Sequence, residues 1–261
     1  MRAAFHLLAT HKTVLKATVL QSLRGKFIGN VFGTAWMVLY PLLFLSMYAL
    51  VFVAILKVRI PDLGTLDYVL VIFSGLVPFL AFSEAFGVGT PSIVANRGLI
   101  KNTLFPIELV VARDVIMGHA TMGLGMVLVW LTALSLGHIH LTHLMLPVIY
   151  LLQIIMTLGI VWFTASLTLF FRDVQQAIPI IVLFLMMVSP IGYTDAMVPE
   201  GLKGILLFNP LSWLMHLYRS CLMEGVVPIE ELLLFATFSL GIFTLGFRFI
   251  SRLKPMFADY A

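Results

Sequence analysis

Two long stretches without a charged residue constrain the fold of this chain more than any other feature. Residues 33–56 and 144–171 comprise 24 and 28 residues, and neither range contains Asp, Glu, Lys or Arg. A helix of about 20 apolar residues, rising 1.5 Å per residue, crosses the roughly 30 Å hydrocarbon core of a bilayer. Only 11% of the residues are charged and the mean hydropathy is +1.07, whereas soluble domains carry about 25% charged residues. The sequence therefore predicts an all-α integral membrane protein.

The apolar pattern predicts six transmembrane helices in one domain that covers residues 1–261. The expected spans are residues 33–56, 68–89, 115–136, 144–171, 174–193 and 232–247, the last extensible to Ile250. Residues 201–223 are also apolar, but Asn209 and Pro210 divide them into two pieces too short to cross. Because exposed backbone is tolerated at membrane depth only beside protein or water, we expect a re-entrant helix pair within the outer segment 194–228.

The distribution of basic residues predicts the orientation in the membrane. With the amino terminus inside and six spans, twelve of the 16 Lys and Arg residues lie on the inner side and four on the outer side. Inner loops carry the excess of basic residues in membrane proteins. A full crossing by residues 201–223 would reduce the ratio to nine against seven. The bias therefore favours the re-entrant pair and places both termini in the cytoplasm.

Residues 1–30 are expected to form an amphipathic helix in the headgroup region. Its apolar side is composed of Phe5, Leu8, Leu15, Val19 and Leu23. Lys12 and Lys16 lie on or beside this side, which an interfacial helix tolerates because long basic side chains reach outward to water. A cytosolic tail without membrane contact is the alternative.

The inner loop between the second and third spans, residues 96–106 (NRGLIKNTLFP), is polar and dibasic. It also contains four apolar residues that would otherwise sit at a wet surface: Leu99, Ile100, Leu104 and Phe105. Exposed apolar clusters usually mark contact sites. We therefore expect a partner protein to dock on this cytoplasmic loop, the alternative being a short connector whose positive charges only set the orientation.

No site for chemistry or for nucleotide binding is recognisable in the sequence. The dipeptide Gly25-Lys26 is followed by Phe27, and Leu20 occupies the place where a phosphate-binding loop needs its first Gly. No nucleophile has a base at usable spacing. We therefore expect no enzyme, no cofactor in this chain and no nucleic-acid partner.

Isolated polar groups leave two questions open. Glu84 lies within the second span, where an ionised acid costs about 2.5 to 3.5 kcal/mol. It is either a proton-coupling residue or an acid near the inner end of the span that is solvated or paired in the bundle. His138, His140 and His143 could bind zinc or copper. Because no fourth ligand accompanies them, a solvated loop is favoured and no metal is expected.

Aromatic residues recur every four positions along the first span, at Trp36, Tyr40, Phe44, Tyr48 and Phe52. Spacing by four places them along one slowly drifting side of a helix. Such rings can stack on the C–H faces of sugars or simply pack in the bundle, with Trp36 and Tyr40 at the membrane interface.

Four motifs resemble the membrane subunit of type-2 ABC exporters, most closely the O-antigen and capsular polysaccharide export permeases. They are RGLIKNTLFP (97–106), FFRDV (170–174), SPIGY (189–193) and NPLSWLMHLYR (209–219). The resemblance covers essentially the whole chain. It implies two permeases acting with two separate ATPase subunits that bind ATP and Mg, and export of a lipid-linked polysaccharide across the bacterial inner membrane.

The resemblance also implies roles for particular residues. The ATPase-coupling helix would contain Arg97, Leu99, Ile100, Lys101, Asn102, Leu104 and Phe105. The outer gate would contain Pro190, Ile191, Gly192, Tyr193, Asn209, Pro210, Trp213, Tyr218 and Arg219. Arg172 and Asp173 would form an inner-side motif, and the substrate channel would be lined by Trp36, Tyr40, Phe44 and Tyr48. The amino-terminal helix would flank the entrance for the substrate.

Three other functions stay open at this point. The same machine could export teichoic acid or a small drug. A membrane-embedded sugar-lipid transferase would need clustered charges for a pyrophosphate and a metal, which the loops do not show. A proton-coupled carrier would depend on Glu84.

Overall fold

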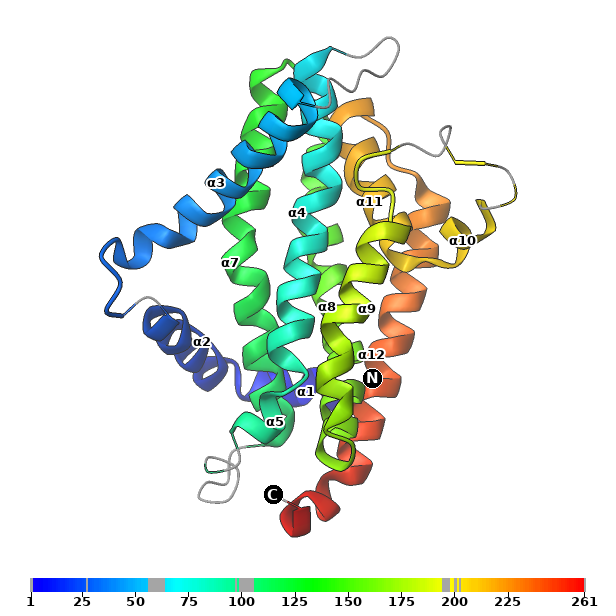
Figure 1. Ribbon diagram of the computed structural model, residues 1–261. Coiled ribbons are helices and arrows are strands. Elements are labelled where there is room, and N and C mark those ends of the chain that lie inside the picture. The colour runs from blue at the N-terminus through cyan, green and yellow to red at the C-terminus, as the bar shows by residue number, and fades with distance from the viewer. Residues whose placement is uncertain are drawn as a thin grey trace.

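The computed structural model describes residues 2–26, 28–55, 64–96, 98, 106–193, 198–199, 201 and 203–260. Within these residues, every regular element is a helix. Figure 1 shows a bundle of upright helices, with α1 (Arg2–Thr10) and α2 (Lys12–Lys26) lying across its lower part. The prediction of an all-α fold is confirmed for the described part of the chain.

Among the described residues, four helices are long and apolar enough to cross a membrane. They are α4 (Thr65–Gly89), α7 (Ile107–Ser135), α8 (Leu146–Phe170), which follows a 3-10 turn at Leu141–Met145, and α12 (Ile229–Tyr260). They coincide with the second, third, fourth and sixth expected spans. The other two expected spans correspond to shorter apolar helices, α3 (Trp36–Ala49) and α9 (Asp173–Val188).

The two shorter helices differ in how much of the expected spans they cover. A π-helical turn, Leu50–Ile55, continues α3, so helical backbone covers most of the expected first span. The fifth span was expected to reach Tyr193, but α9 ends at Val188 and Ser189 is extended, with φ −85° and ψ 141°. Ser189 precedes Pro190, and the ring of a proline disfavours helical geometry in the residue before it.

α7 begins eight residues earlier than predicted, at Ile107 instead of Val115. The sequence placed Glu108, Arg113 and Asp114 outside the span because charges usually mark its boundary. In the structure these charges are paired: Arg113 Nε donates to Asp114 Oδ1 at 2.7 Å, and Lys254 Nζ donates to Glu108 Oε2 at 3.1 Å. Buried charges are tolerated when they are paired, so the helix continues through them.

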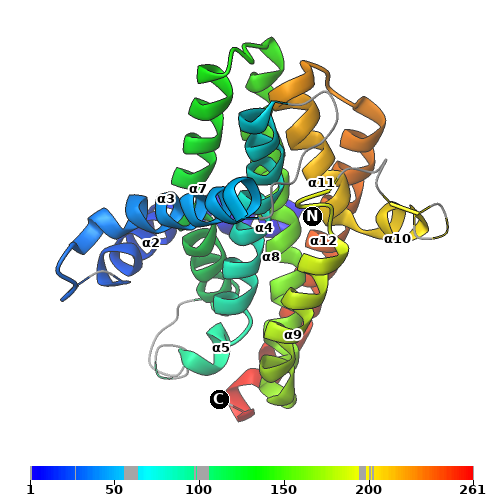
Figure 2. The ribbon, with the colours of Figure 1, turned by 45° about the horizontal axis from the view of Figure 1, so that its top comes forward.

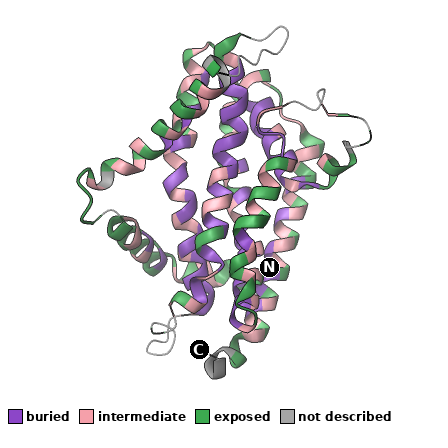
Figure 3. Ribbon diagram, viewed as in Figure 1, coloured by how far each residue is buried: buried purple, intermediate pink, exposed green. Residues whose placement is uncertain are grey.

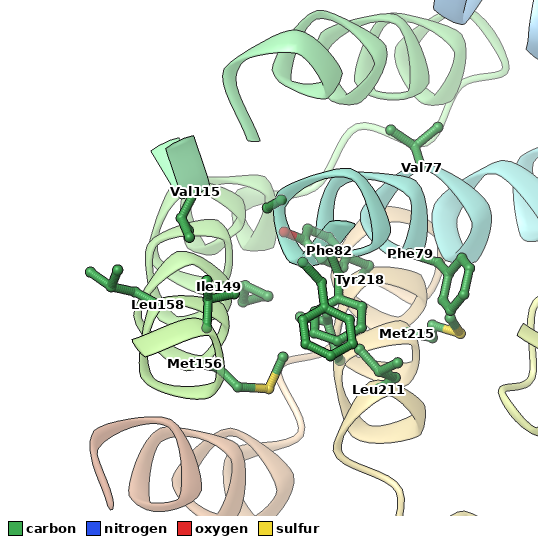
Figure 4. Close-up of a cluster of buried hydrophobic side chains, with 14 of the residues drawn as sticks. Val77, Phe79, Phe82, Val115, Ile149, Met156, Leu158, Leu211, Met215 and Tyr218 are labelled. Atoms are coloured by element: carbon green, nitrogen blue, oxygen red, sulfur yellow. The ribbon is translucent and has the colours of Figure 1, made fainter. Parts of the chain in front are cut away.

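α4 is the centre of the bundle and is buried along most of its length (Figure 3). Its neighbours include α7, α8 and α11 (Pro210–Arg219). Figure 4 shows Phe79 and Phe82 of α4 beside Met215 and Tyr218 of α11. Because α11 belongs to the segment between the fifth and sixth expected spans, this apolar contact fixes that segment against the core of the molecule.

α8 and α12 approach each other closely at a pair of glycines. A Cβ placed on Gly246 would come within 2.0 Å of the carbonyl oxygen of Gly159, and a Cβ on Gly159 within 2.5 Å of the Phe243 nitrogen. Small residues at such crossings let helices in membranes pack backbone to backbone. α8 and α12 therefore form one tightly packed unit.

We expect Gly246→Ala to destabilise the bundle by about 1 to 3 kcal/mol, the usual cost of overpacking a closely packed contact. The added methyl group meets main-chain atoms of Gly159, which cannot move aside as a side chain can. Unfolding by SDS titration in mixed micelles measures the effect. Gly241→Ala on the same helix is the control, because a Cβ there has no neighbour within 4 Å; equal loss in both variants would contradict the packing argument.

The amino-terminal segment forms two helices rather than the single helix expected, with a break at His11. Leu15 and Val19 of the predicted apolar side are buried, and the Phe5 ring lies 5.0 Å from that of Phe243. Lys12 and Lys16 are exposed. The apolar side thus packs against the bundle while the basic residues face outward.

Candidate functional site

A cavity of about 650 Å³ separates the amino-terminal half of α3 from α4 and α7. Its lining combines two aromatic rings, a cluster of polar groups and apolar side chains. The lining residues are Lys26, Asn30, Trp36, Met37, Tyr40, Pro41, Leu80, Ser83, Glu84, Thr121 and Met122. Volume and mixed lining are typical of pockets that bind small molecules or parts of larger ligands.

Glu84 connects three elements on the polar side of this cavity. Its Oε1 lies 2.5 Å from Lys26 Nζ at the end of α2, and its Oε2 accepts a hydrogen bond of 2.7 Å from Thr121 Oγ1 of α7. The side chains of Glu84 and Lys26 are 20% and 39% exposed. Of the two alternatives for Glu84, the paired acid is the one that this geometry matches.

Three members of the predicted aromatic stripe on α3, Tyr40, Phe44 and Tyr48, form a row of contacting rings. Tyr40 and Phe44 stack with centroids 6.1 Å apart, and Phe44 and Tyr48 follow at 4.9 Å. Trp36 and Tyr40 line the cavity, whereas Phe44 and Tyr48 pack against the core. The stripe therefore divides into a half available to a ligand and a half used in packing, and its role as a channel stays a prediction.

The residues predicted for the outer gate come together around Arg219, at the end of α11. Arg219 is 9% exposed, and its guanidinium donates hydrogen bonds to main-chain carbonyls of the SPIGY segment. The acceptors are the carbonyl oxygens of Pro190, of Ile191 at 2.8 Å and of Tyr193 at 3.2 Å, and that of Val71 in α4 at 3.3 Å. Carbonyls left over where α9 ends are thus bound by a buried cation, because a guanidinium has five donors in a fixed plane.

Asn209 and Ser189 connect the same two motifs. Asn209 Nδ2 donates to Ser189 Oγ at 3.0 Å, and Asn209 Oδ1 accepts from the Leu211 main-chain nitrogen at 3.0 Å. Asn209 is thus the N-cap of α11 and separates it from α10 (Lys203–Phe208), with Pro210 as the first helical residue. The predicted break at Asn209-Pro210 is confirmed, and α11 lies beside the upper half of α4 in Figure 1.

Hydrogen bonds also connect the remaining gate residues to their surroundings. Tyr68 donates to the Gly192 carbonyl at 3.3 Å, and Trp213 donates to the Leu207 carbonyl at 3.0 Å. Tyr218 is buried and donates to Gln153 Oε1, whose amide donates to the Pro78 carbonyl. This places Gln153 of α8 between α4 and α11.

The predicted coupling residues, Arg97 and 99–105, lie outside the described residues, but the flanks of the loop are described. Asn96 donates to the Ser92 carbonyl at 2.7 Å and accepts from Arg113 at 3.1 Å. On the other side, Pro106 precedes α7, and Lys254 of α12 reaches both carboxylate oxygens of Glu108 at 3.2 and 3.1 Å. Both flanks are therefore bonded to the bundle.

The FFRDV motif lies at the turn between α8 and α9. Arg172 and Asp173 are exposed, and Asp173 is the first residue of α9. An acid in the first turn interacts favourably with the helix dipole, which accounts for the position of Asp173 but leaves the proposed role of Arg172 a prediction.

The three histidines of residues 138–143 each support a loop contact. His138 Nε2 lies 2.9 Å from Asp67 Oδ1, and His143 joins the Leu222 carbonyl and Trp130 at 3.2 Å each. The His140 ring lies against Gly225, a residue with φ +69°. Among the residues that the structure describes, no group of three His, Cys, Asp or Glu side chains could hold a metal ion.

The sequence did not predict the contacts of Lys26, Gln153 and Lys254. Gln153 could have been suspected, because it is the one amide within the 28 uncharged residues 144–171. Lys26 and Lys254 gave no such signal, since their partners are 58 and 146 residues away in the sequence.

The described part of the chain is a bundle of helices, four of them long and apolar enough to cross a membrane, with a hydrogen-bond network around Arg219 and a cavity beside α3. Residues 12–223 match the family model described as ABC-2 type transporter. The match covers more than half of the chain, so the protein belongs to the ABC-2 type transporter membrane family.

Curated relatives extend the similarity over most of the chain. An O-antigen export system permease protein, RfbA, of Klebsiella pneumoniae is 27% identical over 241 residues, which cover 92% of this chain and 91% of the relative. RfbA of Myxococcus xanthus is 25% identical over 85% of this chain and 84% of its own. The polysialic acid transport protein KpsM of Escherichia coli is 26% identical over 83% of both chains. The resemblance stated from the motifs is thereby confirmed at the level of the family.

Proposed function

We propose that this chain is the membrane subunit of an ATP-driven exporter that moves a lipid-linked polysaccharide from the cytoplasm across the bacterial inner membrane. The observation that carries the proposal is similarity over more than four-fifths of the chain to permeases named for O-antigen and polysialic acid. ATP and Mg would be bound by a separate ATPase. Residues 97–105 would dock on that subunit. Because the residues on both sides of this loop are hydrogen-bonded to the helix bundle, a displacement of the loop would be transmitted to the bundle.

The proposal includes a topology of six spans with both termini in the cytoplasm. α3 with its π-helical turn and α9 would be the first and fifth spans, and α10 and α11 the re-entrant pair. Arg219 of α11 binds the 189–193 segment and Val71, which is near the start of α4. The excess of basic residues favours an inner location for residues 97–105, which follow the other end of α4. The contact with Val71 therefore supports an outer location for α11. The single transmembrane permease domain would then comprise residues 1–261.

Two copies of the chain would form the export path. Support comes from α9, where Ile178 alone of the 16 residues is buried, leaving Ile180, Leu183 and Phe184 exposed by 59% or more. The row of rings on α3 would contact the sugar chain along the export path. The cavity between α3, α4 and α7 would bind the sugar chain where it enters, at the level of the inner headgroups. Trp36 and Tyr40 supply flat faces for sugar rings there.

Deleting the gene in the organism that carries it tests the proposal. We expect surface polysaccharide to be lost and lipid-linked polysaccharide to accumulate on the cytoplasmic face of the inner membrane, because synthesis continues without export. Lectin binding to intact spheroplasts reports the outer face of the inner membrane, and lectin binding to inverted vesicles reports the cytoplasmic face. Unchanged surface polysaccharide, or accumulation of a drug or a teichoic acid instead, would contradict the proposed substrate.

We expect Glu84→Gln to leave export within about threefold of the wild type. The amide still accepts from Thr121, and the lost ion pair with a 39% exposed lysine is worth about 0.5 to 1 kcal/mol. Export per ATP hydrolysed in vesicles that contain the permease and its ATPase measures the effect. Abolished export in this variant, or wild-type export without ATP, would indicate a proton-coupled carrier.

A further inference from the structure

α12 makes a polar contact near each of its ends, and each contact is to a different part of the proposed machinery. The helix is continuous from Ile229 to Tyr260. Near one end, Lys254 binds Glu108; near the other, Glu231 Oε2 lies 2.5 Å from His216 Nδ1 of α11. At 1.5 Å per residue the two contacts are about 35 Å apart.

The inner contact attaches the residues after the cytoplasmic loop to α8 and α12. Glu108 is 2% exposed, in the first turn of α7, and its carboxylate receives Lys254. Its main-chain carbonyl accepts from Trp162 Nε1 of α8 at 3.0 Å. Since α8 and α12 touch at Gly159 and Gly246, the first turn of α7 is held by both members of one packed unit.

The outer contact attaches the same helix to α11. Besides the His216 contact, the Trp213 ring meets the Phe238 ring edge to face, with centroids 5.9 Å apart. α11 ends at Arg219, which binds the carbonyls of residues 190, 191 and 193. The outer segment 189–193 is therefore connected to α12 through α11.

We infer that Lys254 is a positioning residue that couples the cytoplasmic loop to α12, and that α12 carries the displacement to α11 and the outer segment. The inference rests on the proposed function. Its physical basis is stiffness: a helix that is packed backbone to backbone on α8 moves as a body, so a shift of the first turn of α7 reaches the outer end without a chain of separate rearrangements. Without Lys254, the buried Glu108 carboxylate loses its partner and α7 can shift independently of α12.

Lys254 is suited to a test because its side chain is 49% exposed, so its replacement removes a contact and little packing. The permease and its ATPase are reconstituted in vesicles, and export per ATP hydrolysed is compared for Lys254→Glu, Lys254→Gln and Lys254→Arg. Arg252→Glu is the matched control, an exposed basic residue two positions earlier on α12. It removes the same charge without touching Glu108.

We expect Lys254→Glu to lower export per ATP about tenfold, within the usual range of coupling between distant sites, with Lys254→Gln intermediate. Lys254→Arg and Arg252→Glu should stay within about twofold of the wild type. The outer end is followed by the thiol of Gly192→Cys in a Cys221→Ala background. Its ATP-dependent change in maleimide labelling should disappear with Lys254→Glu.

Wild-type export per ATP and unchanged labelling in Lys254→Glu would overturn the inference, as would an equal loss in Arg252→Glu. The proposed function would survive both results, because the wild-type protein would still export with ATP. If the wild-type protein itself fails to export in the presence of its ATPase, the proposed function is wrong and the inference falls with it.

Discussion

Replacing Arg219 by Met is expected to lower the free energy of unfolding by about 3 to 5 kcal/mol, the cost of removing a buried charged donor from its partners. Methionine fills similar space but donates no hydrogen bond, so the carbonyls of Pro190, Ile191 and Tyr193 lose the hydrogen bonds that Arg219 donates to them. The 189–193 segment and α11 would separate. SDS titration of the purified protein in mixed micelles measures the loss.

Arg248→Met is the matched control for this variant. Arg248 is an exposed arginine on α12, and surface substitutions of this kind change stability by about 0.5 kcal/mol or less. Arg219→Lys should fall between the two, because one ammonium group cannot reach all the carbonyls that a guanidinium spans. Equal stability of Arg219→Met and Arg248→Met would show that the network does not hold the outer segment in place.

The double variant Leu99→Asp/Phe105→Asp is expected to reduce export about 100-fold while the permease stays folded and the ATPase continues to hydrolyse ATP. Apolar anchors at protein interfaces cost 2 kcal/mol or more each when lost, and 1.4 kcal/mol corresponds to a factor of ten. Acidic groups at these two positions would also have to lose their hydration on docking, which is costly for a charge without a partner. Export and ATP hydrolysis are measured in the same vesicles.

A second variant, Thr103→Asp, separates docking from a general effect of charge in the loop. It places one acid at a position that is polar in the wild type, and export should stay within about threefold. Normal export by the double variant would refute docking on residues 97–105, and equal losses in the two variants would show that loop charge alone is responsible.

The long helices were predictable because each is encoded by a local pattern. The 28 uncharged residues 144–171 are long and apolar enough to predict a membrane helix, and α8 covers nearly all of them. The start of α7 was mispredicted for the opposite reason. Glu108 resembles a span boundary until Lys254, 146 residues away, is known to neutralise it.

The candidate site divides in the same way. Asn209-Pro210 announces a helix break locally, and the break is found. The binding of residues 189–193 by Arg219, the last residue of the 209–219 motif, depends on tertiary packing and is not encoded in the spacing of the two motifs. Likewise, Glu84 could be a proton site or a paired acid, and the choice depends on Lys26, which only the arrangement of α2 against α4 brings within reach.

The central claim is tested most directly by transport in vesicles that contain the purified permease, its ATPase and a lipid-linked polysaccharide accessible only from the side of the ATPase. The account predicts that the sugar chain becomes accessible on the opposite side when ATP and Mg are supplied, and not with a non-hydrolysable ATP analogue or without the ATPase. Transfer that proceeds without ATP hydrolysis, or the absence of transfer with every component present and active, would contradict it.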